Sequence, residues 1–214
     1  MGPSGWSVYV ITDYRLSGMR PHALVAEEAY RGGADVVQLR DKEQTPGELL
    51  KTARILREIA ESFKRVFIVN DRIDIALASL AHGVHVGYDD FPYPAARSIY
   101  PVPLLLGASA GTAQELREAC AAGVDYIGVG PVFETREAKR DAGSPVGLSF
   151  IKEVRKATDI PLVAIGGIDH ENAASVIQAG ATAVAVISAV VCEDDMCRSV
   201  KRLRDVVLEA KQSR

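Results

Sequence analysis

The sequence has few cysteines, few aromatic residues and no long apolar run. Cys120, Cys192 and Cys197 are its three cysteines, with no C-x-x-C spacing, and this odd, sparse set excludes a disulfide framework and suits a reducing compartment. No stretch approaches the roughly 18 uninterrupted apolar residues of a membrane span. The first residues also lack the basic and apolar regions of a secretory signal. We therefore expect a cytoplasmic protein that does not associate with membranes.

An excess of charge of either sign is also missing. The chain has 25 basic and 28 acidic residues and a formal net charge of -3. Nucleic-acid binding is not indicated, so an anionic ligand would have to be held by local basic residues and backbone donors. With 48% hydrophobic and 25% charged residues, the composition is that of an ordinary globular protein. A length of 214 residues with no internal boundary predicts one domain over residues 1–214.

Short β-branched runs recur along the chain, with helical spacing between them. Their continuous apolar character is typical of parallel strands buried on both faces. The runs cover residues 8–11, 36–39, 66–69, 83–86, 104–107, 126–129, 162–165 and 183–187. An open doubly wound sheet is disfavoured because Thr12 to Arg15, rather than a G-x-G-x-x-G motif, follows the first run. Eight strands with seven or eight helices in this length predict a closed (β/α)₈ TIM barrel.

Local signals mark the ends of several helices. Thr45 and Glu48 predict a capping box, with Pro46 at the first helical position. Thr112 and Glu115 predict a second box. The predicted helices cover residues 22–31, 45–63 and 169–179, and another begins at 112. The longest loop is predicted over residues 133–147.

In such barrels ligands bind where the strands end, and cationic side chains follow the second run. Gln38, Arg40 and Lys42 are two residues apart, so an extended chain would direct all three into the barrel mouth. A buried Gln and Arg need a partner, and an anionic ligand is a natural one. A solvated, charged loop is the alternative.

Carboxylates follow the third and fourth runs. Asp71 and Asp90 would come from neighbouring strand ends, which suits a Mg²⁺ ion that keeps waters and takes ligand phosphate oxygens. The alternative for Asp71 is to cap a helix that begins near Arg72. We interpret His85, within the fourth run, as a hydrogen-bonded barrel histidine rather than a catalytic residue.

Glycine and small polar residues follow the later runs. Gly166 and Gly167 end the seventh run, and Ile187 and Ser188 end the eighth. Loops in these two positions often bind phosphate through backbone N–H groups, which glycine allows to approach closely. A purely structural turn at the two glycines is the alternative.

Further polar side chains follow the fifth and sixth runs. Ser109 could bind ligand oxygens or serve as a structural loop hydroxyl. Thr135 and Lys139 could reach a pyrophosphate from a mobile lid. These side chains would complete a site for a phosphorylated small molecule.

In their order and spacing these residues resemble the thiamin phosphate synthase family, whose superfamily also contains a thiazole tautomerase. The segments that carry the resemblance are Val37 to Lys42, Phe67 to Arg72, Gly83 to Gly87, Ile127 to Phe133 and Val163 to Ile168. The resemblance implies a transferase of thiamine biosynthesis that joins hydroxymethylpyrimidine pyrophosphate to hydroxyethylthiazole phosphate. Its products would be thiamin phosphate and pyrophosphate. The implied mechanism is dissociative, with Mg²⁺-bound pyrophosphate leaving first.

The resemblance also implies a role for each candidate residue. Mg²⁺ would be held by Asp71 and Asp90. The pyrimidine pyrophosphate would be bound by Gln38, Arg40, Lys42, Asn70, Ser109 and Lys139. The thiazole phosphate would be bound by Thr135, Gly166, Gly167, Ile187 and Ser188. The expected catalytic residues are Arg40, Lys42, Ser109 and Lys139, around a leaving group whose growing charge cations stabilise. No nucleic acid or membrane partner is expected, and a homodimer would fit the family.

Three positions depart from the family pattern. Tyr88 stands where the family has Gln, and Gly111 stands where a His is common. The segment from Glu134 to Lys139 lacks the second Thr of the family loop and is one residue longer. The missing His disfavours the tautomerase, in which the matching His is thought to transfer a proton. The altered loop keeps open a non-catalytic barrel that binds thiazole or thiamin phosphate.

Overall fold

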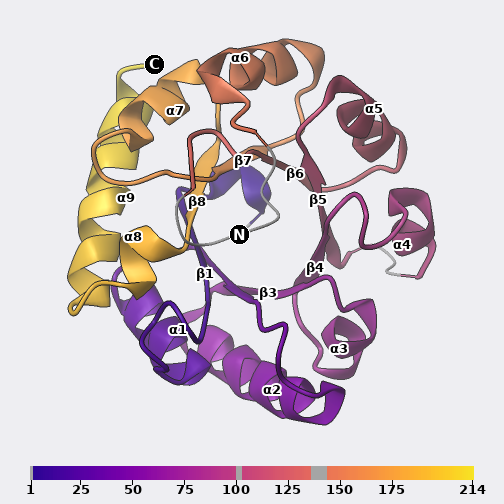
Figure 1. Ribbon diagram of the computed structural model, residues 1–214, viewed down its shortest axis with the longest axis vertical. Helices are drawn as coiled ribbons and strands as arrows, with labels where there is room; N and C mark the ends of the chain where they lie inside the picture. The colour runs from indigo at the N-terminus through magenta and orange to yellow at the C-terminus, as the bar shows by residue number, and fades with distance from the viewer. Residues whose placement is uncertain (1, 100–102, 136–143) are drawn as a thin grey trace.

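A computed structural model describes residues 2–99, 103–135 and 144–214 of the chain. Its parallel strands close into one barrel in sequence order, because β8 pairs with β1 (Figure 1). The strands are β1 (Val8–Ile11), β2 (Val36–Leu39), β3 (Val66–Asn70), β4 (Gly83–Val86), β5 (Leu105–Ala110), β6 (Tyr126–Val129), β7 (Leu162–Ile165) and β8 (Ala183–Val186). The predicted (β/α)₈ barrel is confirmed.

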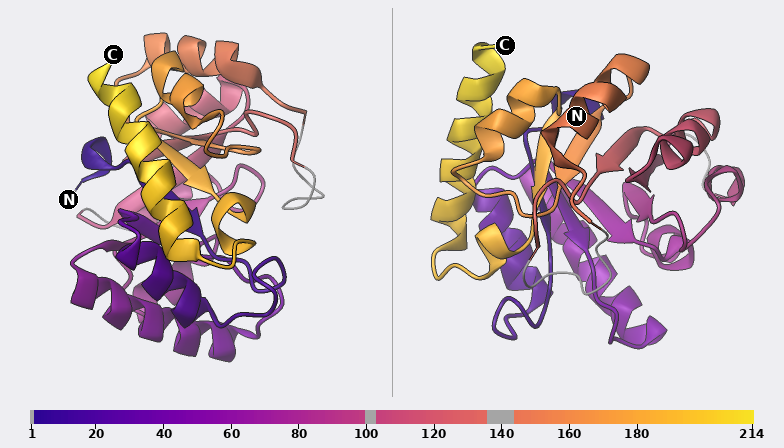
Figure 2. Two further views of the ribbon diagram at one scale, coloured as in Figure 1. Left: turned by 90° about the vertical axis from the view of Figure 1, so that its left-hand side faces the viewer. Right: turned by 45° about the horizontal axis from the view of Figure 1, so that its top comes forward.

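Helices form an outer layer around the strands (Figures 1 and 2). They are α1 (His22–Arg31), α2 (Pro46–Phe63), α3 (Ile73–Ala78), α4 (Tyr93–Ile99), α5 (Ala113–Ala121), α6 (Gly147–Ala157), α7 (Ala173–Ala179), α8 (Ser188–Val191) and α9 (Met196–Gln212), preceded by a 3₁₀ turn, η1 (Pro3–Gly5). Within the described ranges, no helix has the length and apolar character needed to cross a membrane.

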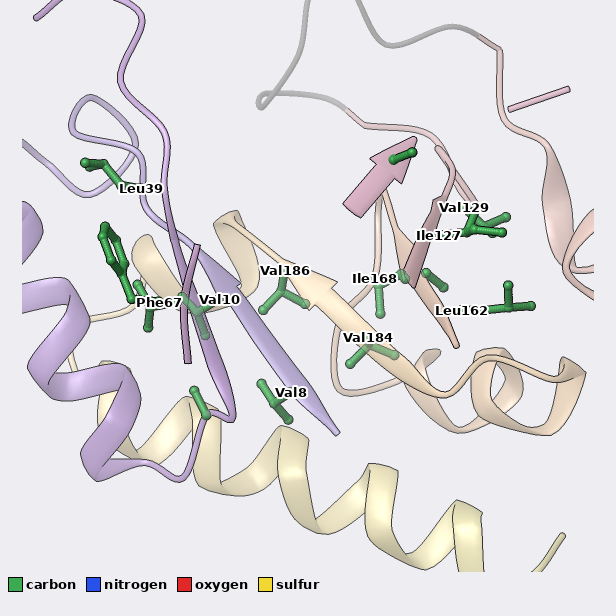
Figure 3. Packing of buried hydrophobic residues seen from close by; sticks show 14 of the residues in the cluster. Val8, Val10, Leu39, Phe67, Ile127, Val129, Leu162, Ile168, Val184 and Val186 are labelled. Atoms are coloured by element: carbon green, nitrogen blue, oxygen red, sulfur yellow. The ribbon is translucent and has the colours of Figure 1, made fainter. Parts of the chain in front are cut away.

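Strand side chains alternate between two cores, because successive residues of a strand point to opposite faces. Val8 and Val10 of β1 point outward and join the layer between strands and helices, which Figure 3 shows with Val184 and Val186 of β8. Tyr9 points inward instead. The smaller inner core consists of Trp6, Tyr9, Ile11, Val36, Val66, Ile68, Tyr126, Val163, Ala183 and Ala185. The two cores hold the strand ends in fixed positions around the barrel mouth.

The predicted helix starts are partly confirmed. Thr45 caps α2 with the complete reciprocal box, as predicted. Thr112 accepts a hydrogen bond from the Glu115 amide, but the Glu115 carboxylate accepts from the Gly111 amide, so the second box is only half formed. The helix predicted from residue 169 begins at Ala173, because the Asp169 carboxylate accepts from two amides in a turn that precedes it.

The C-terminal ends of three strands differ from the prediction, and for β3 the difference is one residue, Asn70. β5 continues to Ala110 because Ser109 and Ala110 pair with Gly128 and Val129 of β6, so Ser109 is a strand residue rather than a loop residue. β8 stops at Val186, and the next residue becomes the N-cap of the short helix α8. The predicted loop 133–147 lies partly outside the described residues.

Candidate active site

A cavity of about 880 Å³ opens at the C-terminal ends of the strands. Residues that follow strands on opposite sides of the barrel line it together, among them Arg40, Asp71 and Gly167. All predicted site residues within the described ranges line this one cavity: Gln38, Arg40, Lys42, Asn70, Asp71, Asp90, Ser109, Thr135, Gly166, Gly167, Ile187 and Ser188. Lys139 lies outside the described residues. The strand ends therefore bring the predicted set into one place, while the role of each residue stays a prediction.

Arg40, directly after β2, is held by two residues that follow β1. Its guanidinium lies 3.1 Å from the Asp13 carboxylate, and the exposed fractions of the two side chains are 13% and 16%. The Arg40 amide donates to the Thr12 hydroxyl at 3.3 Å. The alternative of a solvated loop is therefore wrong for Arg40, whereas Lys42 is exposed at the cavity wall.

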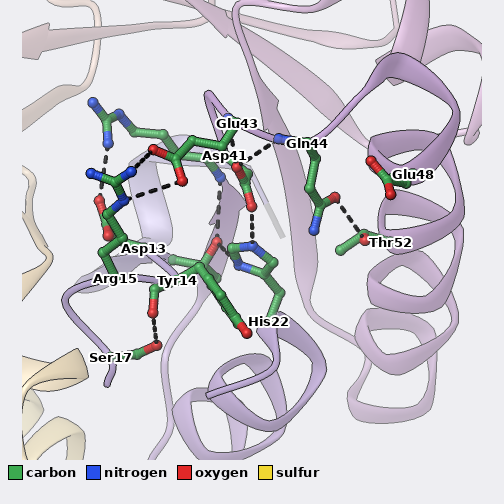
Figure 4. Close-up of polar contacts among 12 residues, drawn as sticks. Asp13, Tyr14, Arg15, Ser17, His22, Asp41, Glu43, Gln44, Glu48 and Thr52 are labelled. Carbon is green, nitrogen blue, oxygen red and sulfur yellow. Dashed lines mark hydrogen bonds and ion pairs between the residues drawn. The ribbon is translucent and has the colours of Figure 1, made fainter. Parts of the chain in front are cut away.

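The next residue, Asp41, fixes the loop from the other side. Its carboxylate lies 3.0 Å from Nε2 of the buried His22, whose Nδ1 lies 2.8 Å from the Thr12 hydroxyl (Figure 4). It also accepts from the amides of Glu43 and Gln44. Burial raises the pKa of Asp41, but the hydrogen bonds lower it by more than burial raises it. The pKa of Asp41 is therefore below its usual range. The carboxylate thus stays charged and holds the loop that carries Arg40 and Lys42.

The two candidate metal ligands lie on neighbouring strand ends. Asp71 has a left-handed φ of 57°, its amide donates to the His85 carbonyl, and its carboxylate accepts from the Asn70 side chain. The N-cap of α3 is Arg72 with no side-chain cap bond, so the capping interpretation of Asp71 is wrong. The Asp90 carboxylate occupies space that a Cβ at Gly87 would fill.

This donor set fits a magnesium ion better than a metal with many protein ligands. Asp71 and Asp90 both line the cavity, and no group of three or more His, Cys, Asp or Glu side chains suited to a metal occurs within residues 2–99, 103–135 and 144–214. Mg²⁺ is usually bound by one or two carboxylates, with water and substrate phosphates completing the shell. The pair is therefore compatible with Mg²⁺ beside a phosphorylated ligand.

Backbone replaces side chains on the wall formed by β6 and β7. Gly166 and Gly167 have φ values of 101° and 64°, which favour glycine. A Cβ at Gly166 would lie 2.6 Å from the Pro131 Cα, and one at Gly167 would lie 2.6 Å from the Glu134 carbonyl oxygen. The glycines thus allow the β6 and β7 loops to pack together. Gly166 and Gly167 are therefore required for this packing, which is also compatible with their backbone N–H groups binding an anion.

The cavity floor is a hydrogen-bonded network that sequence reasoning missed in part. Gln38 Nε2 donates to the Tyr9 hydroxyl at 2.7 Å, and the Tyr9 and Tyr126 hydroxyls lie 3.0 Å apart. His85 lies between Tyr126, 3.1 Å from Nδ1, and Ser109, 3.0 Å from Nε2. The interpretation of His85 as a hydrogen-bonded barrel histidine is confirmed. The available signal for the tyrosines was their inward position within apolar strands.

Tyr88 and Gly111, two of the positions that depart from the family pattern, make hydrogen bonds to α5. Tyr88 donates to Glu118 of α5 at 3.1 Å and packs edge-on against Tyr93, whose hydroxyl donates to the Ser109 carbonyl. Gly111 donates its amide to Glu115 at 2.7 Å. Tyr88 thus connects the loop that carries Asp90 to β5 and α5. The altered segment after Thr135 lies outside the described residues.

Comparison with known proteins agrees with this geometry. The profile of the family described as thiamine monophosphate synthase matches residues 8–190. The chain belongs to this family. It is 47% identical to a thiamine-phosphate synthase of Moorella thermoacetica over 206 residues, which cover 96% of this chain and 98% of the relative.

Further relatives extend the family assignment to structure. A thiamine-phosphate synthase of Methanoculleus marisnigri is also 47% identical, over 97% of this chain and 98% of its own length. The solved thiamine phosphate pyrophosphorylase from Pyrococcus furiosus superposes with a TM-score of 0.89 at 38% identity, covering 97% of this chain and 98% of that one. The family resemblance read from the strand-end motifs is therefore confirmed.

Proposed function

We propose that the chain condenses hydroxymethylpyrimidine pyrophosphate with hydroxyethylthiazole phosphate, giving thiamin phosphate and releasing pyrophosphate. The observation that carries the proposal is one cavity that gathers the cations Arg40 and Lys42, the carboxylates Asp71 and Asp90, and the turn at Gly167. Two phosphorylated substrates need two anion sites within one cavity. Full-length similarity to thiamine-phosphate synthases supports the same reaction.

The cationic side of the cavity suits the departing pyrophosphate. When the bond between the pyrimidine methylene and the pyrophosphate oxygen breaks, negative charge grows on the leaving group. Arg40 and Lys42 would stabilise that charge, and the ion pair with Asp13 holds Arg40 in place before substrate binds. Ser109 and Asn70 would donate hydrogen bonds, and Lys139 is assigned to the same group from its place in the sequence.

The carboxylate side suits a magnesium ion held by Asp71 and Asp90. Bound there, Mg²⁺ would neutralise charge on the phosphate oxygens of the substrate. The left-handed backbone at Asp71 and the space above Gly87 give each carboxylate a defined position at the cavity wall.

The opposite wall suits the thiazole phosphate. Gly166, Gly167, Ile187 and Ser188 would offer backbone N–H groups, and Thr135 would add a side-chain hydroxyl. The thiazole nitrogen would then face the pyrimidine carbon that loses pyrophosphate. Binding both substrates in one cavity turns an encounter in solution into a reaction between neighbours.

A mixed-substrate assay tests the proposal. Purified protein with both substrates and Mg²⁺ is expected to form thiamin phosphate and pyrophosphate in equal amounts, with neither product when one substrate or the metal is omitted. Tight thiazole phosphate binding without turnover would instead support a non-catalytic barrel. Metal-independent proton exchange on a thiazole carboxylate phosphate would support a tautomerase.

Substitution of the two carboxylates gives a sharper prediction. Asp71→Ala and Asp90→Ala are each expected to lower kcat/KM by about 100-fold at fixed Mg²⁺, because the ion loses a charged ligand. Steady-state kinetics and urea unfolding provide the measurements, with the exposed Asp159→Ala as control. Full activity in both variants would remove the proposed metal site.

Two expectations about the whole protein stay predictions. A homodimer fits the family, and light scattering of the purified protein would measure the mass. A cytoplasmic location suits the small, odd number of cysteines, Cys120, Cys192 and Cys197. Cell fractionation would test the location.

A further inference from the structure

The cavity floor contains a continuous chain of hydrogen bonds across the barrel. It runs from Gln38 on β2 through Tyr9 on β1, Tyr126 on β6 and His85 on β4 to Ser109 on β5. Both ends of the chain and all three residues between them line the cavity. The two ends are side chains expected to bind the pyrimidine substrate, so the chain connects two sides of one binding site.

Packing holds the rings of this chain in place. The Trp6 ring packs edge-on against Tyr9 and Tyr126, with ring centroids 5.9 Å and 5.1 Å away. His85 stacks on Tyr126 with a centroid distance of 5.5 Å. Gly107 has no side chain, and a Cβ there would collide with the Tyr126 ring. This packing restricts the positions of the Tyr9 and Tyr126 hydroxyl groups.

Counting protons gives the chain a direction. Burial raises the pKa of Tyr9 and of Tyr126, so each hydroxyl keeps its single proton. Tyr9 accepts from Gln38 Nε2, and its own proton is then available for Tyr126. With Tyr9 as the donor in that pair, the Tyr126 proton is left for His85 Nδ1, because buried donors need acceptors, and the His85 tautomer decides this bond.

The remaining protons follow from the histidine. If Nδ1 of a neutral His85 accepts, the ring proton lies on Nε2 and is donated to the Ser109 oxygen. The Ser109 hydroxyl is then left with its proton for the cavity. At the other end the Gln38 amide uses its nitrogen on Tyr9, which leaves Oε1 for the cavity.

We propose that Tyr9, Tyr126 and His85 are positioning residues. Through their hydrogen bonds, the group that Gln38 presents to the cavity, donor or acceptor, determines the group that Ser109 presents. The floor then presents an acceptor at Gln38 and a donor at Ser109. This pattern matches a pyrimidine that carries an amino donor beside ring-nitrogen and phosphate acceptors. It opposes a 4-oxo pyrimidine, whose carbonyl replaces the amino group. The assignment of this ligand rests on the proposed function, whereas the direction of the chain does not.

The direction is tested on the wild-type protein without substrate. The protein has four histidines, so ¹⁵N-histidine NMR can resolve them, and the variant His85→Asn identifies the His85 signals. The proposal expects the Nε2–H tautomer at His85. An Nδ1–H tautomer would overturn it, whether or not the protein condenses the two substrates.

The coupling is tested by substrate preference. Tyr9→Phe removes the acceptor that holds the Gln38 amide, and Tyr126→Phe leaves the Tyr9 proton free to turn that amide round. Both variants are expected to reduce the preference for the amino over the 4-oxo pyrimidine pyrophosphate about tenfold, measured as a ratio of kcat/KM values. Tyr30→Phe is the matched control, because Tyr30 is a buried tyrosine that donates to the Val66 carbonyl outside this network.

The ratio separates positioning from general damage. A purely structural role would lower kcat/KM for both substrates equally and leave the ratio unchanged, which would overturn the proposal. Near-UV circular dichroism checks the fold of each variant, since Trp6 is the one tryptophan of the chain and contacts both tyrosines. A wild-type protein that forms no thiamin phosphate would count against the proposed function alone, and the His85 tautomer would still decide the direction of the chain.

Discussion

His82, at the entry to β4, shows how one titratable residue can set the pH dependence of stability. Its Nδ1 accepts a hydrogen bond from the Phe67 amide at 3.0 Å, and its own amide donates to the Phe67 carbonyl. Burial lowers the pKa of His82, and the positive charge of Arg57 lowers it further. A proton on Nδ1 would break the bond to β3, so the folded protein favours the neutral ring.

We expect stability to fall as the pH drops below about 6.5, the ordinary value for histidine. In that range the unfolded chain binds a proton that the folded chain resists, so the free energy of unfolding decreases with decreasing pH. His82→Asn retains an acceptor near the Nδ1 position but does not titrate. Urea unfolding between pH 5 and 8 should therefore show a flatter profile for this variant. Parallel profiles for the two proteins would contradict the assignment.

At the scale of single elements, the loop between β2 and α2 is the one that most clearly serves the site. His22 at the start of α1 holds Asp41 (Figure 4). Asp13 after β1 holds Arg40, so two neighbouring segments fix this loop. The exposed fractions of the His22 and Asp41 side chains are 3% and 8%. The Arg40 side chain and the backbone that carries Lys42 are thus placed before any ligand arrives, which reduces the cost of ordering this loop on binding.

His22→Ala should weaken both stability and binding. It leaves the buried Asp41 carboxylate without its side-chain partner, and we expect a loss of about 2 kcal/mol in the free energy of unfolding. The KM for the pyrimidine pyrophosphate should rise about tenfold because the cationic loop loses its support. Urea unfolding and steady-state kinetics measure the two effects. Glu43→Gln, which breaks an exposed pair with Arg15, is the control and should change neither.

The elements also show which signals could be read in advance. The box at Thr45 was predictable because both partners lie within one helical turn. The same pattern at Thr112 predicted a complete box, but only half of it forms. The Glu115 carboxylate accepts instead from the amide of Gly111, the residue that follows β5. β5 itself extends through Ser109 because β6 offers it a partner, and pairing between strands is not visible in a local run of residues.

At the scale of the whole molecule, the barrel mouth was predictable, whereas the floor was predictable only in part. Parallel strands place their C-terminal ends at one rim, so the residues after each run had to meet. The floor depends on contacts between residues far apart in the chain. Tyr9 and Tyr126 are separated by 117 positions, and nothing near either residue indicates the other. The altered segment after Thr135 has no described structure, so its role stays a prediction.

The opposite end of the barrel holds a buried carboxylate with several partners. Asp35, 2% exposed and just before β2, accepts from the Ser7 and Val8 amides and pairs with Arg65 and Arg204. Its carboxylate therefore joins β1, the approach to β3 and the helix α9. Barrels of this kind commonly place function at the end with the cavity and stability at the other.

Asp35→Asn should separate the two ends. Removing one partner of a buried ion-pair cluster leaves two guanidinium groups without compensation, and we expect the free energy of unfolding to fall by about 3 kcal/mol. The cavity lies at the far end of the strands, so kcat/KM at 25 °C should remain that of the wild type as long as the variant is folded. Urea unfolding and the condensation assay, with the exposed Asp205→Asn as control, measure both quantities. A loss of activity without a loss of stability would contradict this separation. It would show that the Asp35 cluster affects the cavity at the other end of the barrel, through a displaced strand.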